Sequence, residues 1–302
     1  MTVQPATHPK VKLRDGGLGF GTTGTDLTLR TIPHSFAPDT LAAIDTLLDT
    51  VSAQNRVAIP LAIESGSRAW GFPSPDSDYD CRFIYVRSAD QYLSPWVPRD
   101  VIETPLVGDL DVNGWDLGKA LKLMLKGNAV IIEWLKSPII YRGDAEFRDA
   151  FLALAEQHSH PTLIARHYLH LGERQRNTYF SDHKHVAIKK LFYALRPAAA
   201  LRWMRVNGMV RLPPMHFPAL MAECDAPSEV AAMVADLLAK KAETRELGTG
   251  LLPDAIRDFI DGEFAAARET LGDVPVRASD EARLEVGDFY RQWVGESRLF
   301  AI

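Results

Sequence analysis

The chain has 302 residues, of which 46% are hydrophobic and 24% charged, and its formal net charge is −5. This mixture is typical of globular proteins, and the length suffices for two domains. The absence of any uncharged apolar run of about 18 residues predicts no transmembrane helix and no membrane partner. Two distant cysteines, Cys81 and Cys224, and an N-terminus without an apolar signal segment favour a cytoplasmic location over a disulfide framework.

The first part of the chain predicts a mixture of helices and strands. Residues 1–37 are rich in glycine, threonine and proline, and we expect a loosely structured segment with one strand at 27–32. The G-x-G-x-x-G at 19–24 lacks the preceding strand and following helix of a dinucleotide site. Helical spacing predicts a helix over 39–53 and a single turn at 67–71. Strands are predicted at 57–63, where Pro60 indicates an edge or a bulge, and at 78–86, 101–106 and 110–115.

From residue 116 onward the apolar period becomes that of helices. An apolar stripe begins at Leu117, residues 131–135 continue it, and the segment 137–140 interrupts it. Further helices are predicted at 144–157, 162–180, 185–206, 227–245, 254–271 and 282–294, and Pro197 is expected to kink or split the third of these. We therefore predict an α+β protein: a small mixed-sheet domain at 38–142, followed by a helical domain at 143–302.

The charges are unevenly distributed along the chain. Residues 37–118 contain thirteen acidic residues and five Lys or Arg, whereas residues 160–215 contain ten Lys or Arg and two acids. An acidic part suits cations, and a basic part suits phosphates. Solvated surfaces would give the same pattern, so both interpretations stay open.

The segment ESGSRAWGFPSPDSDYDCRFIYV, residues 64–86, holds two close carboxylates. Residues two apart on a strand point to one face, so Asp78 and Asp80 are expected side by side, with Arg82 next. Such a pair repels unless a cation or an arginine partner, Arg68 or Arg82, neutralises it. Carboxylates together with substrate phosphates are typical ligands of Mg²⁺.

Gly66 and Ser67 precede these aspartates by about ten residues. A glycine lets the backbone approach a phosphate closely, and a serine hydroxyl with N–H groups at a helix start binds one. A turn followed by a surface D-x-D loop is the alternative. The strand before Gly66 and the apolar strand after Asp80 favour the phosphate and metal site.

This pattern resembles the signature of the DNA polymerase β-type nucleotidyltransferase superfamily, in which Gly-Ser follows one strand and Asp-x-Asp opens the next. More narrowly, the chain is similar to a family of predicted nucleotidyltransferases associated with RNA ligases. Four motifs occur in order over about residues 56–205: GSRAWGFPSPDSDYD, GWDLGKALKLMLKGN, EWLKSPIIY and KKLFYALRP. Two positions depart from that family's pattern: Gly118, where a basic residue is usual, and Ala129, where a proline is expected.

The resemblance implies an enzyme that uses Mg²⁺ or Mn²⁺ to move a nucleoside monophosphate from a nucleoside triphosphate, such as ATP, to an acceptor hydroxyl. An RNA end is the first candidate acceptor, because the family is associated with RNA ligases and the basic segment suits a polyanion. A small molecule or a protein is a chemically equivalent acceptor. The rival hypothesis is a non-catalytic RNA-binding or regulatory module with the same fold.

The resemblance also implies a third carboxylate on a later strand. It favours Asp116, strand position favours Asp111, and a helix N-cap is the structural alternative for Asp116. Further on, the helix expected from residue 185 brings basic and aromatic residues to one face, which suits a triphosphate and a stacked base. The expected catalytic residues are Asp78, Asp80, Asp116 and Asp111, the metal ligands Asp78, Asp80 and Asp116, and the nucleotide-binding residues Gly66, Ser67, Arg68, Lys189, Lys190, Tyr193 and Arg196.

Overall fold

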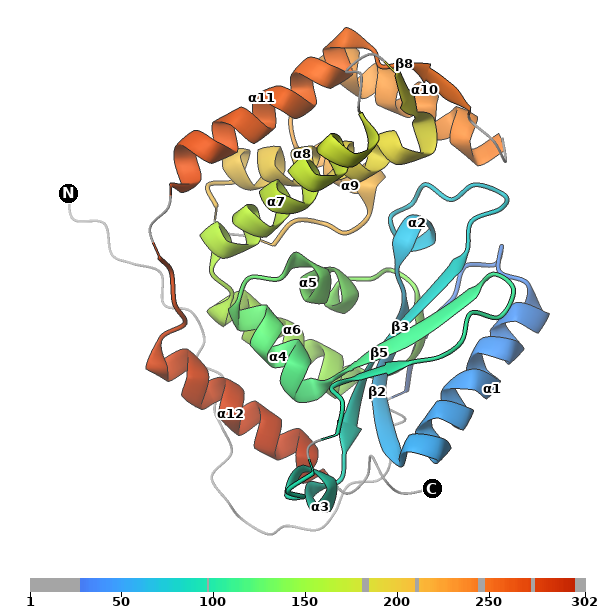
Figure 1. Cartoon of the computed structure of the whole chain (residues 1–302), viewed down its shortest axis with the longest axis vertical. Coiled ribbons are helices and arrows are strands. Elements are labelled where there is room, and N and C mark those ends of the chain that lie inside the picture. The colour runs from blue at the N-terminus through green and yellow to red at the C-terminus, as the bar shows by residue number, and fades with distance from the viewer. Residues whose placement is uncertain are drawn as a thin grey trace, which may run out of the picture.

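The structure is a computed structural model that describes residues 28–96, 98–180, 185–209, 212–243, 248–272 and 275–296. The G-x-G-x-x-G at 19–24 lies outside the described residues. Figure 1 shows a sheet with helices on its two faces and a layer of further helices beyond one end of the sheet. The predicted α+β class is confirmed.

A six-stranded mixed sheet has the order β1-β6-β2-β3-β5-β4. Its strands are β1 Thr28–Thr31, β2 Val57–Glu64, β3 Tyr79–Arg87, β4 Val101–Glu103, β5 Leu110–Asp116 and β6 Ile140–Asp144. Strands β3 and β5 pair in parallel, and the other pairs are antiparallel. Pro60 lies in the central strand β2, so the edge expectation is wrong, but the register shifts between Ala58 and Leu61, as a bulge requires.

Both faces of the sheet are covered by helices. Helix α1 Pro38–Asn55 packs on one face, and α4 Leu117–Leu125, α5 Ala129–Leu135 and α6 Ala145–His158 lie on the other. Alternate residues of β3 therefore enter two cores: Phe83 and Tyr85 join the core of α1, whereas Ile84 and Val86 join that of α4. The short helices α2 Gly66–Ala69 and α3 Ala89–Tyr92 lie at the two ends of β3.

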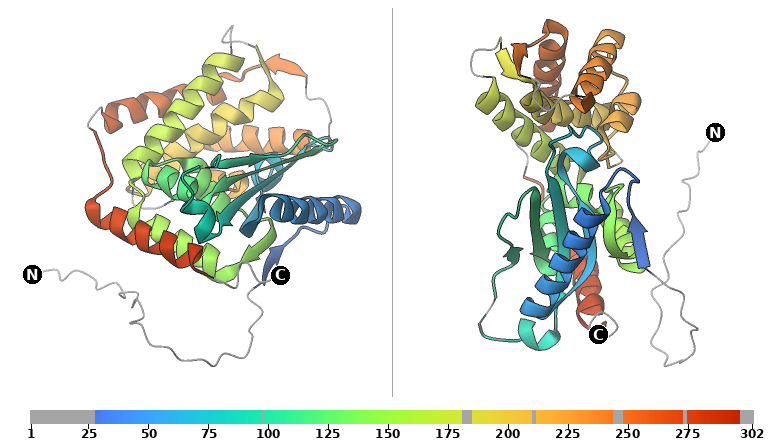
Figure 2. Two further views of the ribbon diagram at one scale, coloured as in Figure 1. Left: turned by 60° about the horizontal axis from the view of Figure 1, so that its bottom comes forward. Right: turned by 90° about the vertical axis from the view of Figure 1, so that its right-hand side faces the viewer.

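The second layer is helical and lies over one end of the sheet, as the right view of Figure 2 shows. It contains α7 Pro161–Tyr179, α8 Ile188–Val206, α9 Phe217–Glu223, α10 Ser228–Glu243 and α11 Asp254–Leu271, with a small sheet of β7 His185–Ala187 and β8 Thr249–Leu251. Helix α8 continues through Pro197, so the expected split does not occur. Strands β6 and β8 and helices α3 and α9 were not predicted, and β7 occupies residues that were expected to begin a helix.

The last helix, α12 Asp280–Val294, returns to the sheet and packs Trp293 against Phe147, with ring centres 5.0 Å apart. The expected domain boundary at residue 142 falls inside β6, and one cluster of buried side chains continues across it. No helix in the described ranges has the length and apolar character needed to cross a membrane.

Candidate active site

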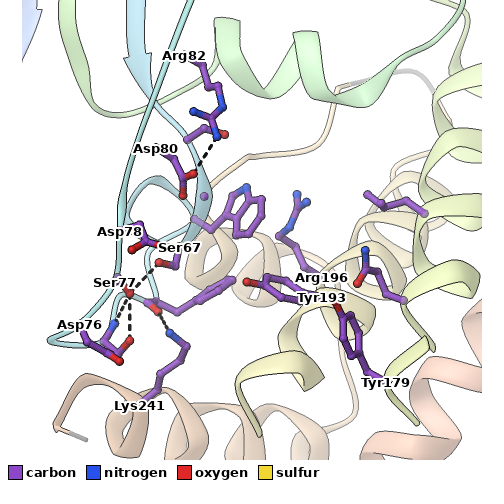
Figure 3. Close-up of a pocket in the computed structure, with 17 residues that line it drawn as sticks. Ser67, Asp76, Ser77, Asp78, Asp80, Arg82, Tyr179, Tyr193, Arg196 and Lys241 are labelled. Atoms are coloured by element: carbon purple, nitrogen blue, oxygen red, sulfur yellow. Dashed lines mark hydrogen bonds and ion pairs between the residues drawn. The ribbon is translucent and has the colours of Figure 1, made fainter. Parts of the chain in front are cut away.

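A pocket of about 500 Å³ lies between the end of the sheet and the helical layer. Figure 3 shows Ser67, Asp78 and Asp80 on one wall and Tyr179, Tyr193 and Arg196 opposite them. The first wall comes from α2 and from the loop and strand that follow it, and the second comes mainly from α7 and α8. The fold therefore brings most of the predicted site residues to one cavity.

The two predicted aspartates differ in their surroundings. Asp80 is the second residue of β3, and burial raises the pKa of its carboxyl, although the charge of Arg82 opposes this effect. Asp78 lies one residue before β3 and is exposed. Within the described ranges, neither the Asp78 carboxylate nor Oδ2 of Asp80 makes a hydrogen bond or ion pair. These oxygens face the pocket as free acceptors.

Gly66 packs directly on Asp80. Its φ is +61°, and a Cβ built on it would lie 2.0 Å from Oδ2 of Asp80. A side chain at this position would collide with the carboxylate and strain the backbone, so the site needs glycine here.

Arg82 is an ion-pair partner of Asp80, as one of the two sequence-based alternatives expected. Its guanidinium lies 2.9 Å from Oδ1 of Asp80 and 2.6 Å from Oδ2 of Asp111. The parallel pairing of β3 with β5 sets Asp80 opposite Asp111, which explains why one arginine reaches both carboxylates. Of the two predicted third carboxylates, Asp111 is the one that lies beside Asp80.

Arg68 has a different role from Arg82. Its guanidinium donates to the carbonyl oxygens of Ser77, at 2.6 Å, and Asp78, at 3.1 Å, and lies 3.8 Å from the centre of the Tyr79 ring. It therefore fixes the backbone that carries Asp78 and makes no hydrogen bond to the aspartate carboxylates.

Asp116 lies at the opposite end of β5 and does not line the pocket. Its Oδ1 accepts a hydrogen bond from the amide of Gly118 at 2.8 Å, and its Oδ2 accepts one from the Tyr92 hydroxyl at 2.7 Å. This is the geometry of a helix N-cap on α4. The structure therefore does not bring Asp116 together with Asp78 and Asp80. Asp116 instead lines a second cavity, of about 550 Å³.

A serine cluster fixes the loop between α2 and β3. The Ser67 hydroxyl donates to Oγ of Ser77 at 2.9 Å, and the amide of Ser74 donates to the same oxygen at 2.8 Å. Sequence reasoning missed Ser74 and Ser77, because serines are common in any loop. Their contacts hold the Ser67 hydroxyl and Asp78 on the same wall.

Glu64 lies behind this wall and is fully buried at the end of β2. Its Oε1 accepts from the amide of Asp80 at 3.0 Å, and its Oε2 accepts from the Tyr141 hydroxyl. Burial raises the pKa of the Glu64 carboxyl to about 8, against the lowering effect of these hydrogen bonds. Glu64 therefore anchors the start of β3 mainly as a neutral acid near pH 7.

The opposite wall is aromatic: Tyr193 lines the pocket, whereas Lys190 lies behind the rings and does not line it. The rings of Tyr179 and Tyr193 have centres 6.4 Å apart, and Nζ of Lys190 lies 4.8 Å and 4.9 Å from them. Trp70 meets Tyr193 edge-on at 6.2 Å. Lys189 belongs to α8, but its side chain lies outside what the structure describes.

Arg196 lines the pocket, but its guanidinium is engaged by a buried glutamate outside the pocket. It is buried, forms an ion pair with Oε1 of Glu133, and lies 4.2 Å from the ring centre of Trp70. Tyr168 donates to the same glutamate oxygen at 3.0 Å. The motifs EWLKSPIIY and KKLFYALRP thus meet in this ion pair, and Arg196 supports the aromatic wall.

Lys241 is a pocket residue that sequence reasoning missed. It comes from α10, is 3% exposed, and donates to the carbonyl oxygen of Phe72 at 2.7 Å. In Figure 3 it lies on the side of Ser77 and Asp76. It adds positive charge near the loop that carries Asp78.

Several arginines of the basic segment 160–215 form ion pairs inside the helical layer. Arg176 pairs with Asp261 at 3.1 Å, and Arg202 and Arg205 pair with Glu263 at 2.9 and 2.8 Å. Part of the positive charge of this segment therefore holds helices together.

Two acids and a Gly-Ser turn at the end of a mixed sheet, facing an aromatic wall, define a protein of the nucleotidyltransferase type. The chain belongs to the RNA repair pathway DNA polymerase beta family, whose model matches residues 42–292. The resemblance drawn from the four motifs is confirmed.

The matches of the chain include one curated relative and one solved structure. The uncharacterised protein YcgL of Bacillus subtilis (strain 168) is 39% identical over 224 residues, which cover 74% of this chain and 85% of that protein. The crystal structure of a nucleotidyltransferase-like protein from Exiguobacterium sibiricum 255-15 matches with 12% identity and a TM-score of 0.29, covering 84% of this chain and 79% of the other.

Proposed function

We propose that the protein catalyses the Mg²⁺-dependent transfer of a nucleoside monophosphate from a nucleoside triphosphate to an acceptor hydroxyl, and that the acceptor is an RNA end. The observation that carries the proposal is the pocket itself, which unites Gly66, Ser67 and two carboxylates with an aromatic wall. Family membership supports the reaction class and the association with RNA repair.

The triphosphate binds at the Gly-Ser turn. The first N–H groups of a helical turn have no partner within the turn, so those of α2 are available to phosphate oxygens. The Ser67 hydroxyl would have to turn from Ser77 to join them. Lys241 contributes positive charge on the same side. The base then extends toward Tyr193 and Tyr179, where an aromatic ring stacks on it.

The donor set fits a hard divalent cation. Asp78 and Oδ2 of Asp80 supply oxygen ligands, and substrate phosphates complete such a site. In the described residues, no group of three or more His, Cys, Asp or Glu side chains is arranged as a metal site, and at this pocket Arg82 lies between Asp80 and Asp111. Bound Mg²⁺ would neutralise charge that develops on the phosphates.

The acceptor hydroxyl attacks the α-phosphorus while the bond from that phosphorus to the pyrophosphate oxygen breaks. The hydroxyl proton passes to a carboxylate on the sheet side. Asp111 is our candidate, since it lies opposite Asp80 and shares Arg82 with it, although its side chain stands just outside the residues that line the pocket. Most of the acceleration in phosphoryl and nucleotidyl transfer comes from positioning and charge neutralisation, which a preformed wall provides.

The test uses purified protein with Mg²⁺ or Mn²⁺, each α-labelled nucleoside triphosphate, and RNA present or absent. Asp78→Asn and Asp80→Asn are the test variants, and Asp109→Asn, at an exposed position next to β5, is the matched control. Label on RNA with wild type and control, but not with the test variants, is the expected result.

Other outcomes separate the alternatives. Label on the protein itself would replace the RNA acceptor by a protein side chain. Loss of all labelling, with RNA binding intact in wild type and in both test variants, would overturn the catalytic proposal and favour the binding module.

A further inference from the structure

The two oxygens of the Asp80 carboxylate have different surroundings. Oδ1 lies 2.9 Å from the guanidinium of Arg82, an ion pair that Figure 3 shows along the strand. Oδ2 makes no hydrogen bond or ion pair within the described residues, and neither does the carboxylate of the exposed Asp78. Asp78 and Oδ2 of Asp80 therefore form the open side of the carboxylate pair, and Arg82 occupies the other side.

Asp111, which lies opposite Asp80 on β5, has partners for both of its carboxylate oxygens. Its Oδ2 accepts a hydrogen bond from Arg82 at 2.6 Å, and its Oδ1 accepts one from the side-chain amide of Asn113 at 3.4 Å. The acid that the strand pairing brings nearest to Asp80 is thus already engaged by donors of the protein itself.

Arg82 is fixed by the backbone as well as by the two acids. Its Nη1 donates to the carbonyl oxygens of Cys81, at 3.0 Å, and Asp111, at 2.7 Å, while its Nη2 lies between the two carboxylates. The side chain is only 15% exposed. Moving the guanidinium away would break all four hydrogen bonds, and two of them do not depend on the charge of the acids. We therefore expect the guanidinium to keep this position when a cation and a nucleotide bind.

This position is the one that a second metal ion would need. In two-metal sites the ions lie about 3.5–4 Å apart, so that one carboxylate can reach both ions through its two oxygens. With one cation at Asp78 and Oδ2 of Asp80, the ligands left for a second are Oδ1 of Asp80 and Oδ2 of Asp111. Nη2 of Arg82 already lies between these two oxygens, so the residues present do not fit a second ion.

We propose that the site takes a single divalent cation, on Asp78 and Asp80, and that the guanidinium of Arg82 serves in place of a second one. A guanidinium supplies a permanent positive charge and several N–H donors, but it has no coordination position for a substrate hydroxyl. The acceptor hydroxyl is therefore activated by a carboxylate and not by contact with a metal. This inference rests on the proposed function of the same pocket.

The test counts Mn²⁺ ions in the protein with a bound nucleotide analogue. A methylene bridge between the α- and β-phosphates prevents transfer, and the analogues of the four common nucleoside triphosphates are compared. Electron paramagnetic resonance then detects the bound Mn²⁺. We expect one Mn²⁺ per chain with the spectrum of an isolated ion. Two spin-coupled ions, about 3.5–4 Å apart as in two-metal sites, would overturn the proposal, and so would the absence of any bound ion.

Replacement of Arg82 should create the second site. Arg82→Met removes the charge at similar side-chain length, so two spin-coupled Mn²⁺ ions should bind. Adding Asp111→Asn to this variant should restore a single ion, because it removes a ligand of the new site. Arg142→Met, which breaks the ion pair with Asp49 outside the pocket, is the matched control and should bind one ion like wild type. A single ion in Arg82→Met would overturn the proposal.

Asp111→Asn alone gives the answer if Arg82→Met does not fold. Since Asp111 is not a ligand in the wild type, the single variant should still bind one Mn²⁺ together with the nucleotide analogue. Its Mn²⁺ affinity should change by less than about fivefold, the effect of one partly exposed charge. A larger loss of affinity would mean that Asp111 is a metal ligand and would overturn the proposal.

The ion count does not depend on turnover, so it separates this inference from the proposed function. If wild type transfers no nucleotide but binds one isolated Mn²⁺, the proposed reaction fails and the inference stands. If transfer occurs with two coupled ions, only the inference fails. Where transfer occurs, its rate should reach a plateau once all nucleotide carries Mg²⁺, and a further rise with free Mg²⁺ would overturn the proposal.

Discussion

The two walls of the pocket differ in how the chain builds them. The sheet wall comes largely from one continuous stretch, residues 65–82, in which a turn, a loop and a strand follow one another. The helical wall collects Tyr179, Tyr193 and Arg196 from two helices, and Lys241 is added from a third. A short stretch can thus carry the reacting groups, while the opposite wall requires the whole helical layer to fold.

A buried glutamate lies behind each wall, and the carboxyl groups of the two glutamates have different kinds of partner. Glu64 accepts from neutral donors, an amide and the Tyr141 hydroxyl, and its raised pKa keeps it mainly uncharged. Glu133 pairs with the guanidinium of Arg196. Replacing each glutamate by glutamine should therefore destabilise the protein strongly at Glu133, behind the helical wall, and only slightly at Glu64, behind the sheet wall.

The largest effect on stability is expected for Glu133→Gln. The substitution leaves the Arg196 guanidinium buried without its counter-charge, which typically costs about 3–5 kcal/mol. Urea unfolding followed by tryptophan fluorescence measures the loss. Glu156→Gln, exposed on α6, is the control and should stay within about 0.5 kcal/mol of wild type. A loss below about 1 kcal/mol at Glu133 would contradict the comparison.

The next effect concerns activity and separates the two candidates for the third carboxylate. Asp111→Asn should lower kcat on the order of 10²–10³-fold, as the loss of one preorganised electrostatic group does. Its Arg82 pair is partly exposed, so stability should fall by less than about 1 kcal/mol.

Asp116→Ala is the counterpart. It removes the N-cap of α4 and should cost about 0.5–2 kcal/mol of stability while the folded protein keeps its kcat. The opposite result, a loss of kcat in Asp116→Ala and an unchanged kcat in Asp111→Asn, would mean that Asp116 is the third catalytic carboxylate, as the family resemblance favoured.

The same contrast explains what the sequence could predict. The sheet wall was predictable because Gly66 and Ser67 lie in one turn, and Asp78 and Asp80 lie just before and at the start of one strand. The short strand β6 was missed because it begins two residues after Pro138 and resembles the end of a helix.

The helical wall was predictable only in part, since motif similarity pointed to α8 but not to its partners. Lys240 and Lys241 are neighbours in one helix, yet the Lys240 side chain is 62% exposed and Lys241 is buried in the pocket. Helical spacing puts Lys241 on the same face as the buried Val230 and Val234. Only the packing of α10 against Phe72 brings that face to the pocket, and contacts between distant segments cannot be read from local sequence.

A pH series sharpens the comparison at Glu64. Its folded-state pKa of about 8 lies above the ordinary value of 4.5, so between these pH values the folded protein holds a proton that the unfolded chain has lost. The free energy of unfolding therefore falls as pH rises from about 5 to 8 and then levels off. Glu64→Gln lacks this change.

We expect the stability of Glu64→Gln relative to wild type to improve across this window by at least about 1.4 kcal/mol, the equivalent of one pKa unit. Urea unfolding at pH 5, 7 and 9 without divalent cations measures it. A constant difference would mean that Glu64 is charged in the folded protein throughout.

The smallest expected effect tests whether the walls divide the work between binding and reaction. Lys190 lies over the rings of Tyr179 and Tyr193, and cation–π contacts of this kind contribute about 0.5–1 kcal/mol at exposed sites. Lys190→Met should therefore raise the KM for nucleoside triphosphate about two- to fivefold at unchanged kcat, with Lys240→Met as the exposed control. A change in kcat instead would mean that the helical wall also acts in the transition state, and the division between a reacting wall and a binding wall would no longer hold.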